Sequence, residues 1–205
     1  MIQPKHRAVA ILVGLVLTIG CKTAKNEPKP QPVDSGAAAK EPSKASAATP
    51  GAIARVHPSA AATTQPVDSN ITGTVTFAKS SDGVVVTIDL SGFAPNSTHG
   101  FHVHEKSDLS APDLSSAGPH FNPAGHKHGG LNMPMSHAGD FGNITADANG
   151  NVHATITSRD ISIGTGPTGV VGRSVIVHAK PDDLRTDPSG NSGARVAGGV
   201  IELQR

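Results

Sequence analysis

The sequence predicts an all-β fold: an eight-stranded antiparallel Greek-key β-sandwich or barrel with long loops. From Gly51 onward, short runs alternate apolar and polar residues, which is typical of half-buried strands. Turn signals such as Ser81-Asp-Gly83 and Ala148-Asn-Gly150 separate several of these runs. No helical period of useful length interrupts them, so packed strands must supply the core.

Eight segments are expected to form the strands of one domain over residues 51–205. In chain order they are Ala52–Val56, Asn70–Phe77, Val84–Leu90, Thr98–His104, Asn143–Ala146, Val152–Thr157, Ser174–His178 and Gly199–Leu203. His57 and His153 fall on or beside these strands, and His99 lies near a strand start. We interpret these three as surface or packing histidines.

The amino terminus has the pattern of an export signal. A basic segment, residues 5–7, precedes the apolar run 8–20, which has about the length of a signal-peptide core and is short for a membrane span. Cys21, the only cysteine, follows Thr-Ile-Gly as at a bacterial lipoprotein cleavage site, although Thr18 stands where leucine is more usual. We therefore predict a signal peptide over 1–20 and a lipid on Cys21. Simple secretion or an uncleaved anchor are the alternatives.

Residues 22–50 differ in composition from the rest of the chain, because Lys, Pro, Ala, Ser and Glu dominate and no apolar period appears. Such a segment cannot bury enough apolar surface to offset its ordering entropy. We expect residues 21–50 to be a disordered tether that carries the lipidated cysteine. The protein would then be exported and held at a membrane of the cell envelope or periplasm.

The composition argues against two kinds of function. A net charge of +1, with no basic stripe, gives no case for nucleic-acid binding. Trp and Tyr are absent, which excludes a tyrosyl-radical mechanism and leaves any redox work to a metal.

Histidines concentrate in residues 100–140, a stretch otherwise rich in Gly, Pro and Ser. Its candidate donors are His102, His104, His120, His126, His128, His137 and Asp140. His102 and His104 stand two apart on a predicted strand, so their rings point to the same side. The other donors lie on a long aperiodic segment that metal coordination can order. Imidazoles with one carboxylate suit zinc or copper better than calcium or magnesium, so we expect long metal-binding loops.

The number of donors points to two metals. His178 follows the apolar run Ser174-Val-Ile-Val and is expected to face the same region, whereas His126 competes with nearby His128 and is left out. Two four-coordinate sites need eight donors, and the remaining seven suffice if one imidazole bridges both metals. A catalytic site with an open position and a loose histidine-rich metal-binding tract are the alternatives.

Six motifs resemble those of the copper/zinc superoxide dismutase family. They are Gly100-Phe-His-Val-His-Glu105, Ser116-Ala-Gly-Pro-His-Phe-Asn-Pro123, Lys127-His-Gly-Gly130, His137-Ala-Gly-Asp140, Gly142-Asn-Ile-Thr-Ala146 and Val175-Ile-Val-His178. The motifs stand in family order with family-like spacing, and the resemblance covers about Gly51 to Gln204. A β-sandwich is the known architecture of this family and agrees with the predicted strands.

The resemblance implies one copper and one zinc ion per subunit. Copper would be bound by His102, His104, His120 and His178, and zinc by His120, His128, His137 and Asp140, with His120 as the bridge. Asp182 matches the acid that holds the unused nitrogens of His102 and His128, and a solvated loop acid is the alternative. Arg195 matches the arginine that orients an anion beside copper, and a salt-bridging surface arginine is the alternative.

The implied function is the dismutation of superoxide to oxygen and hydrogen peroxide, protecting the cell envelope, with Arg195 and His120 as catalytic residues. Superoxide would be the substrate, and a membrane the partner of the lipid anchor. The alternative is a non-catalytic envelope protein that binds copper and zinc on the same fold. The complete donor set and Arg195 favour the enzyme. An adhesion module leaves the donors unexplained, and a homodimer stays open because family members pair through different surfaces.

The chain departs from the family pattern in two places. Leu114 and Gly198 stand where the family carries an internal disulfide. We expect Leu114 to pack where the sulfur would lie, with Gly198 leaving room, and stability to depend strongly on bound metal. The segment 182–195 is shorter than in eukaryotic members, which removes charged residues that guide the anion there. Lys180 and Arg185 are weak candidates for supplying positive potential instead.

Overall fold

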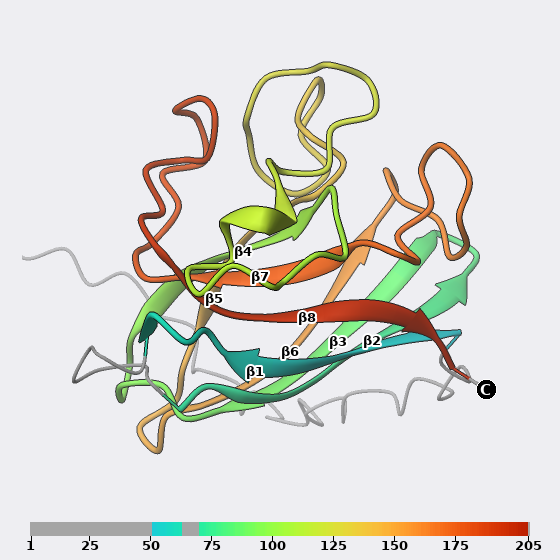
Figure 1. Cartoon of the computed structure of the whole chain (residues 1–205). Helices are drawn as coiled ribbons and strands as arrows, with labels where there is room; N and C mark the ends of the chain where they lie inside the picture. The colour runs from blue at the N-terminus through green and yellow to red at the C-terminus, as the bar shows by residue number, and fades with distance from the viewer. Residues whose placement is uncertain (1–50, 63–69, 205) are drawn as a thin grey trace, which may run out of the picture. The chain divides into compact units, whose positions relative to one another are not determined.

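The computed structural model describes residues 51–62 and 70–204, and there it confirms the predicted all-β fold (Figure 1). The strands are β1 (Ala52–Pro58), β2 (Thr72–Ser80), β3 (Gly83–Ser91), β4 (Thr98–His104), β5 (Asp140–Thr145), β6 (Asn151–Ser158), β7 (Ser174–His178) and β8 (Arg195–Leu203). A single 3₁₀ turn, η2 (Ser115–Ala117), lies between β4 and β5. Within these described residues, no helix has the length and hydropathy that crossing a membrane requires.

The strands form one antiparallel sheet in the order β5-β4-β7-β8-β1-β2-β3-β6. The chain passes from β3 to β4 and from β6 to β7 by crossing over strands that lie between them, which makes the topology a Greek key. The two outer strands of this order, β5 and β6, lie next to each other. The sheet is therefore a nearly closed barrel.

Alternation of the side chains places one face of each strand in the barrel interior. On β3, Val84, Val86, Ile88 and Leu90 are buried, while the residues between them are half-buried or exposed. Phe77 is among the largest fully buried side chains of the core. Branched side chains pack well on a pleated surface, and their removal from water is the main stabilising contribution to such a core.

Both predicted turns are present. Ser80 pairs with Gly83 across the β2–β3 hairpin, so Ser81 and Asp82 form its loop. Before β6, Gly150 has φ 78°, and a Cβ there would collide with the carbonyl oxygen of Phe93. Only glycine fits this second turn.

Every predicted strand is present, and most bounds agree within two residues. β2 runs from Thr72 to Ser80 rather than from Asn70 to Phe77, and two other strands begin earlier than predicted. β5 begins at Asp140 rather than Asn143, and Asp140 stands opposite His102 of β4. β8 begins at Arg195 rather than Gly199. The small residues Ala197 and Gly198 interrupt the apolar alternation there, which hid the first half of β8 in the sequence.

Two long connections meet at one end of the barrel (Figure 1): residues 105–139, between β4 and β5, and residues 179–194, between β7 and β8. Gly100 N–H donates to the Lys180 carbonyl at 2.8 Å, which ties the second connection to β4. All predicted loop donors and Asp182 therefore come from two segments held at the same end.

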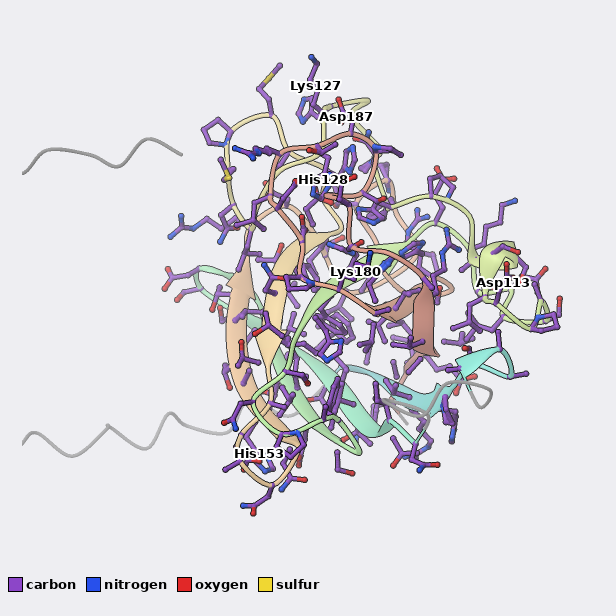
Figure 2. The ribbon with its side chains drawn as sticks, turned by 90° about the vertical axis from the view of Figure 1, so that its left-hand side faces the viewer. Asp113, Lys127, His128, His153, Lys180 and Asp187 are labelled. Carbon is purple, nitrogen blue, oxygen red and sulfur yellow. The ribbon has the colours of Figure 1, made fainter. Side chains whose placement is uncertain are left out.

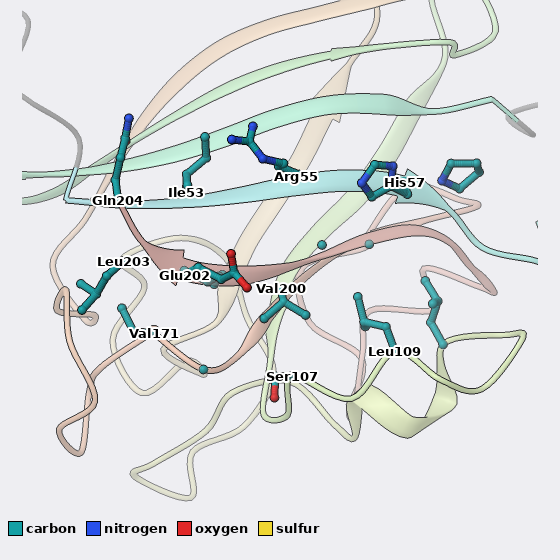
Figure 3. Close-up of a pocket in the computed structure, with 16 residues that line it drawn as sticks. Ile53, Arg55, His57, Ser107, Leu109, Val171, Val200, Glu202, Leu203 and Gln204 are labelled. Carbon is teal, nitrogen blue, oxygen red and sulfur yellow. The ribbon is translucent and has the colours of Figure 1, made fainter.

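A surface groove runs along β1 and β8 (Figure 3). Its lining includes Ile53, Arg55, Leu109 and Leu203, and none of the seven predicted metal donors. The groove is therefore separate from the predicted metal site.

Candidate metal centre

Strand β4 carries its two histidines on one face, as the alternation predicted. Phe101 and Val103 belong to the barrel core, so His102 and His104 face the other side. Both histidines are nonetheless buried, because the long connections cover them. β4 is paired on both sides, to β5 and β7, and this holds the two rings in a fixed frame.

A first group of donors consists of four imidazoles. His102, His104, His120 and His178 are all buried, and each places a ring nitrogen within 4.8 Å of the others. His120 comes from the first connection and meets His104 through an isolated β-bridge, while His178 ends β7 beside β4. The Nε2 atoms of His104 and His178 lie 3.3 Å apart. Four converging imidazoles suit copper or zinc.

A second group shares His120 with the first. Its donors are His120, His128, His137 and Asp140, which are all buried and within 4.8 Å of one another. Asp140 Oδ1 lies 2.8 Å from His120 Nδ1, 3.1 Å from His128 Nδ1 and 3.2 Å from His137 Nδ1. Three imidazoles and one carboxylate at such distances match the donor set of a tetrahedral zinc site.

Three buried ring nitrogens have no hydrogen-bond partner among the described residues: His102 Nδ1, His120 Nε2 and His128 Nδ1. An unsatisfied buried nitrogen destabilises a fold, so native proteins rarely keep one without a use. All three belong to the two groups, and a metal ion at each group would satisfy them. The residues therefore fit two metal ions that share the ring of His120.

Asp182 connects the two groups. Its Oδ2 accepts a hydrogen bond from His102 Nε2 at 2.8 Å, and its Oδ1 accepts one from His128 Nε2 at 2.9 Å. These are the contacts that the resemblance implied for Asp182. Gly190, at φ 62°, packs against this carboxylate, and a Cβ there would overlap Asp182 Oδ1. A carboxylate that holds both rings fixes their tautomers and leaves Nδ1 of each free for a metal.

Burial keeps the first group neutral. It lowers the pKa of His120 to about 4 and that of His178 to about 2. Burial also lowers the pKa of His102 and of His104. Neutral imidazoles carry the lone pairs that a metal needs, so these rings are ready to bind one at neutral pH.

For Asp140 and His128, contacts between the carboxylates and the imidazole rings together affect the pKa more than burial does. Burial alone would raise the pKa of Asp140, but its close contacts with the rings of His120, His128 and His137 hold it well below its usual range. Burial alone would lower the pKa of His128, but the two carboxylates beside its ring, those of Asp140 and Asp182, raise it to about 9. Asp140 is therefore an anion at neutral pH and strengthens this group as a cation site.

Arg195 lies at the start of β8, beside the first group. Its guanidinium donates to the carbonyl oxygens of Leu114 at 2.6 Å and Gly118 at 2.7 Å. Its positive charge contributes, after burial and neighbouring histidines, to the lowered pKa of His104 and of His178. The charge of Arg195 therefore reaches the first group, and its side chain is fixed to the loop rather than to a surface carboxylate.

Two supporting residues were not found from the sequence. Asp187 Oδ1 accepts the backbone N–H of His128 at 2.6 Å, and Figure 2 shows the two residues side by side. Buried His99 bonds the carbonyl oxygen of His178 at 2.8 Å, so this packing histidine also holds a donor strand. No sequence signal pointed to either contact, because the partners are far apart in the chain.

The remaining candidates lie elsewhere. His57 is exposed, and His153 pairs with Asp89 at 2.9 Å on the barrel surface, at the opposite end from His128 in Figure 2. His126 belongs to neither donor group. Cys21, the predicted signal peptide and the predicted tether lie outside the described residues.

Leu114 packs beside Gly198, and these are the two positions at which the resemblance implies a disulfide in the family. Leu114 is 6% exposed and packs with Ala117 and Ile176. A Cβ added to Gly198 would lie 3.2 Å from Leu114 Cδ1 and 2.8 Å from Ile176 Cδ1. The expected arrangement is confirmed: Leu114 occupies the space, and Gly198 leaves room for it.

The fold and site together define a class: an antiparallel β-barrel whose loops gather six imidazoles and one carboxylate into two adjoining metal sites. The sequence model of the copper/zinc superoxide dismutase family matches residues 71–201. A superoxide dismutase [Cu-Zn] from Neurospora crassa is 43% identical over 146 residues, which cover 67% of this chain and 94% of that protein.

Solved structures agree. The clock protein EA4 superposes with a TM-score of 0.64 at 38% identity, over 76% of this chain and 96% of that one. The structure of a double mutant of a SOD-like protein from Bacillus subtilis superposes with a TM-score of 0.62 at 34% sequence identity. This match covers 72% of this chain and 94% of that one. The chain belongs to the copper/zinc superoxide dismutase family. It is accordingly an oxidoreductase that dismutates superoxide, with copper and zinc as its cofactors.

Proposed function

We propose that this chain dismutates superoxide at a histidine-bridged copper–zinc site and that it works in the cell envelope. Copper is held by His102, His104, His120 and His178, and zinc by His120, His128, His137 and Asp140. One ring, that of His120, belongs to both sets.

The observation that carries the proposal is the placement of His120. Its Nδ1 lies 2.8 Å from Asp140 Oδ1, among the zinc donors. Its Nε2 is buried, has no partner among the described residues, and faces the other three imidazoles. One ring thus offers a nitrogen to each metal, which is what a bridge requires.

The reaction turns two superoxide ions and two protons into one oxygen and one hydrogen peroxide. Bound copper supplies the one-electron redox chemistry, which zinc lacks. His120 takes up a proton at Nε2 in the first half of the cycle and donates it to the product in the second. Arg195 attracts and orients the anion. Asp182 holds the rings of His102 and His128, so the donor geometry survives both halves.

The bridge can be tested spectroscopically. Co²⁺ should replace zinc in the second group, with copper in the first and both contents measured. If His120 bridges the metals, the two paramagnetic ions couple and the Cu²⁺ resonance at low temperature is largely lost. Replacing the exposed His57 by Gln should leave this loss unchanged. A Cu²⁺ signal of full intensity beside fully bound Co²⁺ would contradict the bridge.

The envelope location is the second part of the proposal. It is supported by the basic segment 5–7, the apolar run 8–20 and Cys21, followed by the polar tether over 22–50. Superoxide crosses membranes poorly because it is charged, so an enzyme outside the cytoplasm meets superoxide produced there. Metabolic labelling with a radioactive fatty acid should mark the full chain expressed in a bacterium, and Cys21→Ser should abolish the label. An unlabelled wild-type protein would refute the anchor.

Self-association is the third part. The groove along β1 and β8 is lined by the half-buried Ile53 and the exposed Leu203, with Arg55 and Glu202 on the same strands (Figure 3). A twofold axis through this groove would cover the apolar side chains and pair the opposite charges. Sedimentation should show a dimer that Leu203→Glu dissociates and that Leu184→Glu, at another exposed leucine, leaves intact. A wild-type monomer at high concentration would exclude the dimer.

A further inference from the structure

The histidine that both long connections reach is His128. It lies in the connection between β4 and β5 and is a donor of the second group. From the connection between β7 and β8, Asp182 Oδ1 accepts a hydrogen bond from its ring Nε2 at 2.9 Å. This bond fixes the ring, and the backbone that carries the ring needs contacts of its own.

Two carboxylates hold that backbone. The N–H of His128 donates to Asp187 Oδ1 at 2.6 Å, and the next amide, that of Gly129, donates to Asp140 Oδ2 at 2.9 Å. Hydrogen bonds in which one partner is ionised are shorter and stronger than those between neutral groups. Because the two amides stand on either side of the Cα atom of His128, they fix the direction in which its side chain leaves the backbone. Asp140 is itself a donor, so Asp187 is the support that comes from outside the second group.

Asp187 belongs to a turn with a fixed shape. Asp183 closes this turn, because its carboxylate accepts the N–H of Thr186 at 2.8 Å and the Oγ–H of Thr186 at 2.7 Å. The same carboxylate accepts a hydrogen bond from Asn191 Nδ2 at 2.9 Å. The turn holds the carboxylate of Asp187 against the backbone of His128, at the end of the barrel where Figure 2 labels both residues.

Within the described part of the chain, Asp187 reaches only one of the two donor groups. Asp182 bonds the rings of His102 and His128, so it supports a donor of each group. No hydrogen bond among the described residues joins Asp187 to any of the four imidazoles of the first group. A change at Asp187 should therefore affect the metal of the second group and spare that of the first.

The segment around His128 has little regular structure of its own. Between β4 and β5 the chain forms only the 3₁₀ turn η2. A site whose binding-competent form is populated only part of the time binds its ion more weakly by that fraction. A bond that fixes the backbone of His128 before the ion arrives therefore raises the affinity of the site.

We propose that Asp187 is a positioning residue for zinc, which sets the zinc affinity of the second group through the backbone of His128 and leaves the copper affinity of the first group unchanged. This inference rests on the proposed assignment of zinc to the second group. Asp187 is not itself one of the metal donors.

The test measures the affinities for zinc and copper separately, by chelator competition on the full chain. All variants carry Cys21→Ser, because a free thiol would also bind metal. Zinc is titrated with copper already bound, and copper with zinc already bound. Asp187→Ala should weaken zinc binding about tenfold, the range for contacts that support a metal-binding histidine, and should leave copper affinity unchanged. Asp187→Asn keeps an oxygen that can accept the N–H of His128, so it should restore most of the zinc affinity.

Asp160→Ala is the matched control, because it removes another exposed carboxylate, one that has no hydrogen bond to His128 among the described residues. It should leave both affinities at the wild-type value, which would exclude the loss of negative charge as the cause. A general loss of stability would weaken both metals alike, so the difference between zinc and copper separates positioning from stability.

The inference is wrong if Asp187→Ala binds zinc as tightly as the wild type, or if it weakens zinc and copper equally. It is also wrong if Asp187→Asn loses as much zinc affinity as Asp187→Ala, or if Asp160→Ala loses as much as either. A wild-type protein that bound copper but no zinc would instead overturn the assignment of zinc to the second group, and this inference with it.

Discussion

Arg195 and His104 donate hydrogen bonds to the same acceptor, the carbonyl oxygen of Gly118, at 2.7 Å and 2.9 Å. Arg195 donates a second bond to Leu114. The cation that we propose to orient superoxide and a ring that we propose to bind copper are therefore fixed to one point of the loop. Because guanidinium stays protonated at any ordinary pH, this arrangement keeps a positive charge beside the copper group.

Replacing Arg195 should affect the rate and spare the metals. Arg195→Ala removes the cation and none of the seven donors, so superoxide decay should slow by about tenfold to a hundredfold while both metals stay bound. Arg195→Lys keeps the charge but not the paired N–H groups, so its rate of superoxide decay should lie between those of the wild type and Arg195→Ala. Arg159→Ala, at an exposed arginine just after β6 and outside the site, is the control and should change the rate little. A wild-type rate in Arg195→Ala would remove Arg195 from the mechanism.

Replacing Asp182 should affect the metals first. Asp182→Asn keeps the size but loses the charge and one of the two acceptor oxygens for His102 and His128. Hydrogen bonds to metal-binding histidines typically contribute about 10- to 100-fold to metal affinity. We therefore expect metal affinity to fall by about this factor in Asp182→Asn, as measured by chelator competition. Asp160→Asn, an exposed acid outside the site, serves as the control. Unchanged affinity for both metals would show that the two rings need no shared carboxylate.

The donors on strands could be predicted from the sequence, because a strand fixes which residues share a face. His102 and His104 alternate on β4, and His178 ends an apolar run, so their common direction follows from a period of two. The family resemblance then identified the loop donors His120 and His128. The structure brings all of these together as expected.

The supporting contacts could not be predicted in the same way. Asp187 and His128 are 59 residues apart and meet through a backbone N–H, for which a sequence has no signature. Arg195 was placed by motif, but its strand was not, since Ala197 and Gly198 hide the alternation at the start of β8. Long-range contacts between loops depend on the closed barrel, which local patterns do not encode.

The side chain that replaces the disulfide should contribute strongly to stability. Leu114→Ala would leave a cavity between Ala117 and Ile176, at a cost of about 2–4 kcal/mol, measured by urea unfolding of the metal-loaded protein. Leu184 is 38% exposed, so Leu184→Ala should lower the free energy of unfolding by less than about 1 kcal/mol. Equal costs at the two positions would mean that Leu114 does not take over the role of the bridge.

Metal removal should destabilise the protein. It leaves three buried ring nitrogens without a partner among the described residues, in a chain whose single cysteine forms no internal disulfide. Since ligands that bind only the folded state stabilise it in proportion to their affinity, we expect the melting temperature to fall by about 10 °C or more after chelation. Calorimetry of the loaded protein, of the chelated protein and of the chelated protein after both metals are added back measures this change in melting temperature. A shift below about 2 °C would be evidence against metal-dependent stability.

Superoxide decay after pulse radiolysis measures the proposed activity itself, on protein whose copper and zinc contents are determined in the same sample. We expect a rate constant near the diffusional ceiling of about 10⁸–10⁹ M⁻¹s⁻¹, which superoxide dismutases are already known to approach. That result would also show that catalysis needs neither the disulfide nor a longer connection before Arg195. Decay no faster than in buffer, with both metals fully bound, would contradict the account and leave a metal-binding protein without this activity.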